Sequence, residues 1–108
     1  MLVSILGTEY SIVESTEDFD ENLKDKDGYC DTSAKICAVE AMKERKPGMK
    51  MNLEVYKNAV KRHEIIHAFL YESGLECCAD WAQNEEMIDW IAIQFPKMLQ
   101  AFKKVGCI

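Results

Sequence analysis

Apolar and polar residues alternate in one way over residues 1–40 and in another way after residue 50. In the first part, short runs rich in β-branched and aromatic residues are separated by turn residues. Leu2–Leu6 and Tyr10–Ser15 are two such runs with a glycine between them, so they predict a hairpin. Gly28–Val39 predicts a second hairpin, with its turn at Asp31–Ala34 and a strand at Lys35–Val39.

After residue 50 the apolar residues follow a helical period. Asn52 suits the N-cap of a helix and Gly74 suits the left-handed position after a last turn, so we expect a helix over about 52–73. At about 100° per residue, its apolar residues form one broad stripe. The only histidines of the chain, His63 and His67, fall inside that stripe.

A second apolar stripe predicts another helix over about 84–104. Asn84 suits its N-cap, acidic residues occupy its first turns and two lysines close it. Pro96 lies inside the apolar pattern and predicts a kink. Since strands precede two helices in a chain of 108 residues, the sequence predicts a single α+β domain over residues 1–108.

Composition and charge narrow the class of protein. The formal net charge is -6 and basic residues gather only at Lys43–Lys50, so nucleic acid is not expected as a partner. The acidic run Glu14–Asp27 predicts a solvated loop. No segment is apolar enough to cross a bilayer, and Met1–Tyr10 lacks the features of a signal peptide, so no membrane partner is expected. The five cysteines, an odd number without a CxxC pair, favour reduced thiols in the cytoplasm.

Residues 63–67 have the sequence HEIIH, which matches the H-E-x-x-H zinc motif. Residues four apart on a helix lie one above the other, so His63 and His67 can bind the same Zn²⁺ ion. Glu64 lies at the edge of that face, where it can act as general base on a zinc-bound water without binding the metal itself. The alternative is a pair of core histidines satisfied by hydrogen bonds, which we disfavour because both interrupt an apolar stripe.

A catalytic zinc site needs a third protein ligand, and here the candidates are carboxylates or thiols. In the second helix Glu85 lies on the flank of the apolar stripe, whereas Glu86 points nearly opposite, so we choose Glu85. The alternative role of Glu85 is that of a simple first-turn charge. Asp89, one turn further on, is a candidate acceptor for the free N–H of a ligand histidine. Cys77 and Cys78 are the rival ligands.

The segments HEIIHAFLYESGL and NEEMIDWIAIQF resemble the gluzincin metallopeptidases. In that family a Glu ligand on a second helix follows HExxH, and Asp or Asn comes four residues later, an order that Glu85 and Asp89 match. The second helix also looks like that of the ImmA/IrrE type, although Ile88 replaces a small residue and Asp89 replaces Asn. The chain is similar as well to the small zincin-like proteins of phages and prophages, the single-domain minigluzincins. The resemblance covers about Tyr29–Phe102, and HExxH is its most specific part.

This resemblance implies a zinc-dependent metallopeptidase that hydrolyses a peptide bond, with His63, His67 and Glu85 as the metal ligands. It implies a zincin-like fold, in which an antiparallel sheet of about three or four strands packs on two or three helices. It also implies that the strand at Lys35–Val39 lines the cleft and pairs with an extended peptide. The implied partner is a peptide or protein substrate, for example a regulatory protein such as a repressor.

The residue that stabilises the oxyanion in such peptidases is usually Tyr, His or Arg, and no further histidine is present here. Tyr71, one turn after His67, and Tyr56 are candidates, with packing as the alternative role of each. The competing function is a catalytically inactive, zinc-stabilised interaction domain of a phage or prophage. A third possibility is a metal-free domain that binds a phage or host protein.

Overall fold

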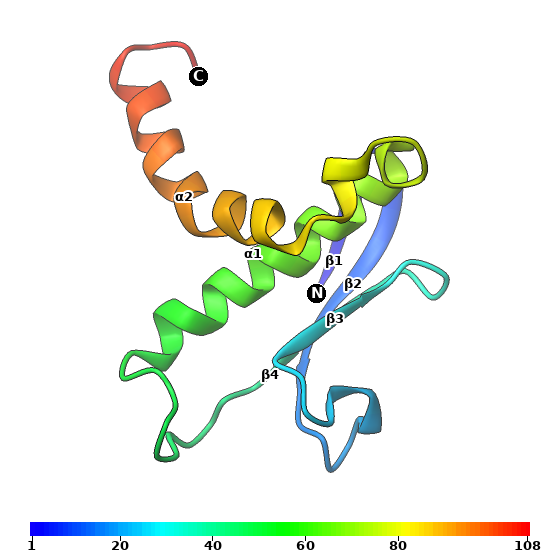
Figure 1. Ribbon diagram of the computed structural model, residues 1–108, viewed down its shortest axis with the longest axis vertical. Helices are drawn as coiled ribbons and strands as arrows, with labels where there is room; N and C mark the ends of the chain where they lie inside the picture. Colours follow the sequence, from blue (N-terminus) through cyan, green and yellow to red (C-terminus); the bar gives the residue numbers. More distant parts are fainter.

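A mixed sheet and two long helices form the α+β fold, which a computed structural model describes over all residues 1–108 (Figure 1). Both predicted hairpins are present, and each consists of two antiparallel strands. The strands are β1 (Leu2–Ile5), β2 (Thr8–Ser15), β3 (Gly28–Asp31) and β4 (Ile36–Glu40). In space they follow the order β1-β2-β4-β3, so the second hairpin joins the first through its second strand.

The expectation of a purely antiparallel sheet is wrong at the junction of the hairpins, where β2 and β4 run parallel. The segment between β2 and β3 crosses back through the short 3-10 helix η1 (Glu21–Leu23), which packs against β3 and β4. β4 therefore becomes a central strand, and its consecutive residues Cys37, Ala38 and Val39 are all fully buried. A continuous buried run of this kind is typical of a strand that is covered on both faces.

This order of strands also corrects the expectation that the strand at Lys35–Val39 pairs with an extended peptide. Both edges of β4 are already occupied, by β2 on one side and by β3 on the other. The free edges of the sheet belong to β1 and β3. Of these two strands, β3 is the one with the closer packing against the helix that carries HEIIH.

Helix α1 (Leu53–Glu72) crosses the sheet with the predicted bounds. The Asn52 side chain accepts a hydrogen bond from the Val55 amide at 3.2 Å, and Gly74 follows the helix with a φ of +82°. The helix approaches the edge strand closely at Gly28, where a Cβ atom would lie 2.9 Å from the Ala38 carbonyl oxygen and 3.0 Å from Val60 Cγ1. A glycine at this position therefore lets helix and edge strand come into contact.

Helix α2 (Glu85–Lys104) also has the predicted bounds and the predicted cap, since Asn84 accepts a hydrogen bond from the Met87 amide at 2.9 Å. Two 3-10 helices, η2 (Leu75–Cys77) and η3 (Asp80–Gln83), connect it to α1. Pro96 has no N–H to offer the Ala92 carbonyl, and Arg62 Nε donates to that oxygen instead at 2.6 Å. Figure 1 shows the predicted bend in this part of α2.

The apolar stripe of α2 is buried only in its first part. Ile88 and Ala92 are fully buried, whereas Phe95 and Phe102 expose 42% and 37% of their surface. Beyond the bend the helix projects away from the sheet and from α1 (Figure 1). Neither α1 nor α2 combines the length and the apolar character needed to span a membrane.

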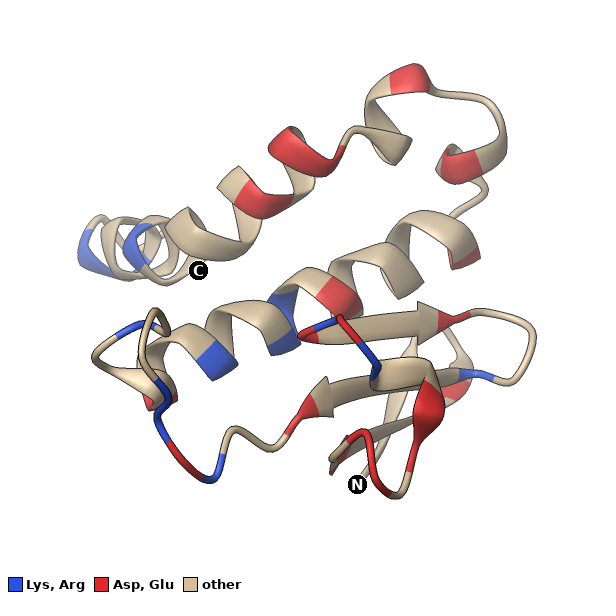
Figure 2. Cartoon of the chain, turned by 60° about the horizontal axis from the view of Figure 1, so that its bottom comes forward, with Lys and Arg blue, Asp and Glu red and all other residues tan.

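The acidic run Glu14–Asp27, predicted as a solvated loop, includes the end of β2 and the 3-10 helix η1 (Figure 2). Leu23 in η1 is buried to 1% exposure, and Asp20 caps η1 and also accepts a hydrogen bond from the Tyr29 hydroxyl at 2.6 Å. Glu14 forms ion pairs with two lysines of α1, so part of the acidic charge is neutralised within the chain.

Candidate metal centre

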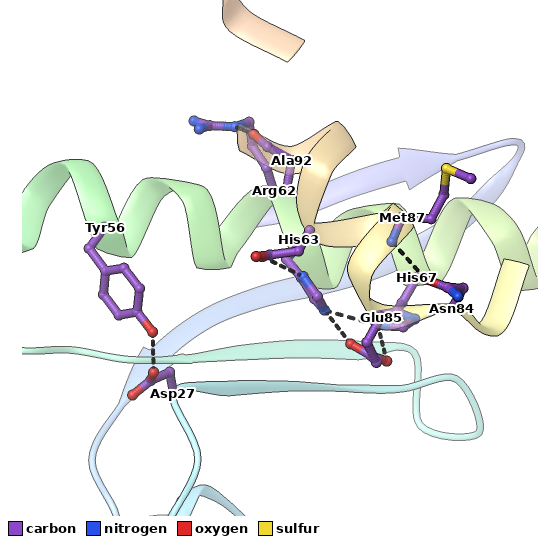
Figure 3. A network of polar contacts seen from close by, with 10 residues as sticks. Asp27, Tyr56, Arg62, His63, His67, Asn84, Glu85, Met87 and Ala92 are labelled. Carbon is purple, nitrogen blue, oxygen red and sulfur yellow. Dashed lines mark hydrogen bonds and ion pairs between the residues drawn. The ribbon is translucent and has the colours of Figure 1, made fainter. Parts of the chain in front are cut away.

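Three side chains from two helices converge on one point. His63 and His67 project from the same side of α1, and the first turn of α2 brings Glu85 to them (Figure 3). Glu85 Oε2 lies 2.9 Å from His63 Nε2, Glu85 Oε1 lies 3.2 Å from His67 Nε2, and the two Nε2 atoms are 3.2 Å apart. One nitrogen or oxygen atom from each of the three residues lies within 4.8 Å of the others, which makes them a group that could hold a metal ion.

Asp89 contacts the opposite nitrogen of the His63 ring, with Oδ1 3.3 Å from Nδ1. A carboxylate at this position favours the tautomer with the proton on Nδ1, so that Nε2 directs its lone pair at the Glu85 carboxylate. Two electron-rich atoms at this distance need either a second proton on the imidazole or a metal cation between them. Two imidazole nitrogens and one carboxylate are a donor set that zinc binds, and so the residues present fit this metal.

The other ligand candidates lie elsewhere. The sulfur atoms of Cys77 and Cys78 contact the Gly74 carbonyl oxygen at 3.1 and 3.2 Å, beyond the end of α1. Neither thiol belongs to the metal-binding group, and neither does Glu86.

Glu64 is the one charged residue that the fold buries, with 8% of its surface exposed. It lines a cavity of about 320 Å³ together with His63 and Asp89, next to the point where the three donors meet. The pKa of the Glu64 carboxyl is raised to about 7, mainly by burial and also by the charge of Glu85, while His63 and Lys26 oppose the shift. The pKa of this carboxyl therefore lies close to neutral pH, which suits a group that takes up and releases a proton.

The structure places Tyr56, and not Tyr71, on this cavity. The ring of Tyr71 lies under the Lys35 ammonium group, 4.9 Å from its nitrogen, and is not among the residues that line the cavity. Tyr56, two turns before His63 on α1, lines it and donates a hydrogen bond from its hydroxyl to Asp27 (Figure 3). This hydrogen bond, together with burial, raises the pKa of Tyr56 to about 12, so the phenol keeps its proton.

Part of the cavity wall was not predicted from the sequence. The sequence places Lys26 and Asp27 in the acidic loop and Gly28 only at the start of a strand. The spacing of these residues carries no signal of a site, because the fold alone brings them beside α1. They matter because they line the cavity together with Glu64, and a Cβ atom at Gly28 would lie only 3.2 Å from Glu64 Cγ.

The site is thus defined by its donor atoms and its cavity. No protein-family model matches the chain, and comparisons with curated proteins and with solved structures also give no significant match.

Proposed function

We propose that this protein is a small zinc-dependent metallopeptidase of the gluzincin type, in which His63, His67 and Glu85 hold the metal. The observation that carries the proposal is the convergence of these three donors beside a cavity that His63 and Glu64 line. A zinc ion at this point acts as a Lewis acid, which polarises a carbonyl group and lowers the pKa of water.

The protein's own contribution to the reaction is carried mainly by Glu64. Its carboxylate accepts the proton of the attacking water and passes it to the nitrogen of the leaving amine. Burial has raised the pKa of this carboxyl towards neutral pH, and such a group is suited to both steps. Asp89 holds the His63 ring in the tautomer and orientation that binding requires.

The proposed substrate is an extended peptide segment, because the edge of the sheet beside the site is open. An extended peptide can add to an exposed sheet edge through main-chain hydrogen bonds. The strand concerned is β3, whose first residue Gly28 lines the cavity together with Glu64. Tyr56 lies on the same cavity and replaces Tyr71 as the candidate for stabilising the oxyanion, to which its hydroxyl would donate in place of Asp27.

Two measurements test the proposal. Elemental analysis of the purified protein should find one zinc ion per chain, and a fluorogenic peptide library should contain sequences that the protein cleaves. Glu64→Gln should retain the zinc and lose about 10²–10⁴-fold in cleavage rate. Glu86→Gln is the matched control, since Glu86 is an exposed residue of α2 outside the donor group, and it should cleave as the wild type does. Undiminished cleavage by Glu64→Gln would exclude the proposed mechanism.

A second function is supported by exposed aromatic side chains on α2. Trp90, Phe95 and Phe102 are exposed, and exposed apolar surface often marks a protein-interaction site. In this alternative the protein is a zinc-stabilised interaction domain without catalysis, as in a degenerate phage or prophage protein. It predicts that zinc raises the melting temperature while no member of the peptide library is cleaved.

A further inference from the structure

Cys30 and Cys37 face each other across the two strands of the second hairpin. They are directly paired in the register of β3 and β4, and their sulfur atoms lie 3.6 Å apart. Both side chains point towards α1, since Cys37 Sγ lies 3.5 Å from the main-chain carbonyl oxygen of Glu64. The proposed peptidase mechanism gives neither thiol a role.

The hydrogen-bond pattern of the hairpin decides which kind of pair this is. In an antiparallel ladder, hydrogen-bonded and non-hydrogen-bonded pairs alternate. The Glu40 amide donates to the Asp27 carbonyl oxygen at 2.8 Å, so that pair is hydrogen-bonded. Counting three residues along each strand places Cys30 and Cys37 in a non-hydrogen-bonded pair. In such pairs the Cα atoms are about 4.5 Å apart, which lies within the range that a disulfide bridges.

Access to the two sulfur atoms is unequal. Cys37 is fully buried, whereas Cys30 is only half-buried and lines a surface cavity of about 450 Å³ along β3. A small oxidant can therefore reach Cys30 first, with Cys37 held in contact behind it. This order, an accessible thiol followed by a resolving thiol, is what the stepwise formation of a disulfide requires.

We propose that Cys30 and Cys37 are a redox site, which low-molecular-weight disulfides of the glutathione class convert to an intrachain disulfide. The Cys30 thiolate attacks the small disulfide, forms a mixed disulfide and releases one small thiol. The Cys37 thiolate then attacks the Cys30 sulfur, closes the protein disulfide and releases the second small thiol. The two protein thiols are oxidised, the small disulfide is reduced to two thiols, and the two thiol protons end on these products.

The disulfide would act on the wall of the cavity beside Glu64. Gly28 lies two residues from Cys30 on the same side of β3, and a Cβ atom there would be 3.2 Å from Glu64 Cγ. Linking β3 to β4 next to this contact fixes the edge strand against the helix. Oxidation also removes the Cys37 S–H group, which points at the Glu64 carbonyl oxygen. The redox state of the pair is thereby coupled to the position of Glu64.

The test uses the full chain with Cys77, Cys78 and Cys107 replaced by serine, which leaves only the proposed pair. All three replaced residues are exposed, so the fold should tolerate the change. The variant is incubated with oxidised glutathione in the presence of EDTA, and thiol titration and mass spectrometry follow the reaction. We expect both thiols to disappear with loss of the mass of two hydrogen atoms. The melting temperature should rise by roughly 5–10 °C and return to its starting value with dithiothreitol.

Two further variants in this background test the order of the steps. With Cys37→Ser the reaction should stop at one glutathione adduct on Cys30. With Cys30→Ser the buried Cys37 should stay unmodified over the same time. The proposal is wrong if the two-cysteine variant keeps both thiols, or if it accumulates a stable glutathione adduct in place of the disulfide. Since zinc is excluded by EDTA, this result does not depend on the metallopeptidase proposal.

Discussion

Two glutamates of α1, eight residues apart, lie in opposite environments. Glu72 accepts hydrogen bonds from Tyr10 at 2.7 Å, Lys35 at 2.8 Å and Thr8 at 3.0 Å. The Lys35 ammonium group is the main reason that the pKa of Glu72 is lowered. Glu64 is held above its usual pKa by burial, and its environment provides no compensating hydrogen bond.

The comparison distinguishes a glutamate that stabilises the fold, Glu72, from one whose environment suits chemistry, Glu64. At Glu72 the fold gives a carboxylate the partners that keep it charged, and the group ties α1 to the sheet. At Glu64 the fold removes water and leaves the carboxyl beside an open cavity. An uncompensated buried carboxyl is costly, and such sites are often functional. The predictions below test this contrast, starting with the largest expected effect.

The Glu64 region should lose its metal when Glu85 is changed. Glu85→Gln replaces the proposed carboxylate ligand by a neutral amide, and we expect zinc affinity to fall by about 10³-fold, more than the 10–100-fold typical of residues that only support a ligand. Competition with a chromogenic chelator measures this loss. Glu72→Gln, a matched change on the other side of the contrast, should leave zinc affinity unaltered. Equal losses of zinc affinity in Glu85→Gln and Glu72→Gln would contradict the view that the Glu72 region has no part in metal binding.

The two glutamates should give the metal-free protein opposite dependences on pH. The folded pKa of Glu64 lies above its unfolded value, so the folded state binds the proton more tightly and stability falls as pH rises from about 4.5 to about 7. The fall attributable to Glu64 should approach about 3 kcal/mol. The folded pKa of Glu72 lies below its unfolded value, so its contribution is present above the unfolded pKa and is lost as pH falls through the folded pKa.

Urea unfolding of the metal-free protein between pH 4 and pH 8 measures these slopes. Glu64→Gln should become progressively more stable than the wild type as pH rises above about 5. Glu72→Gln should instead be less stable than the wild type by a nearly constant amount above about pH 5, and the difference should shrink as pH falls towards 4. A constant difference between Glu64→Gln and the wild type at every pH would show that burial does not perturb Glu64.

Removing one hydrogen-bond donor to Glu72 should destabilise the fold. Tyr10→Phe removes the hydroxyl that donates to Glu72 but leaves the fully buried ring in place. Since hydrogen bonds to charged groups contribute more than neutral ones, the variant should lose about 2 kcal/mol of unfolding free energy. Its zinc affinity should not change. Tyr71→Phe, on a half-exposed ring, is the control and should be close to neutral in stability.

The smallest expected effect concerns Asp89, which contacts His63 and not the metal position. Asp89→Asn keeps the shape of the side chain but weakens its preference for a proton on His63 Nδ1. Zinc affinity should fall about tenfold, with little change in the stability of the metal-free protein. Isothermal titration with zinc checks this. An unchanged affinity would mean that the contact between Asp89 and His63 has no orienting role.

Much of the local structure could be predicted from the sequence, because it depends on residues close together in the chain. Asn52 and Asn84 cap their helices through the amides three residues on, and Gly74 adopts the left-handed conformation after α1. The spacing of His63 and His67 and the direction of Glu85 on its helix follow from the geometry of a single helix. These features needed no knowledge of distant contacts.

Only the tertiary structure decided how these elements meet. The crossing through η1 makes β4 a central strand and β3 the open edge, and no local propensity encodes that choice. The same fold brings Lys26, Asp27 and Tyr56 to the cavity of Glu64 and pairs Cys30 with Cys37. The physical reason is that hydrogen-bonding partners between strands, and the burial of a charged group, depend on residues far apart in the sequence. HEIIH therefore identified two of the three candidate donors, and the packing of α1 on the sheet determined the surroundings of Glu64.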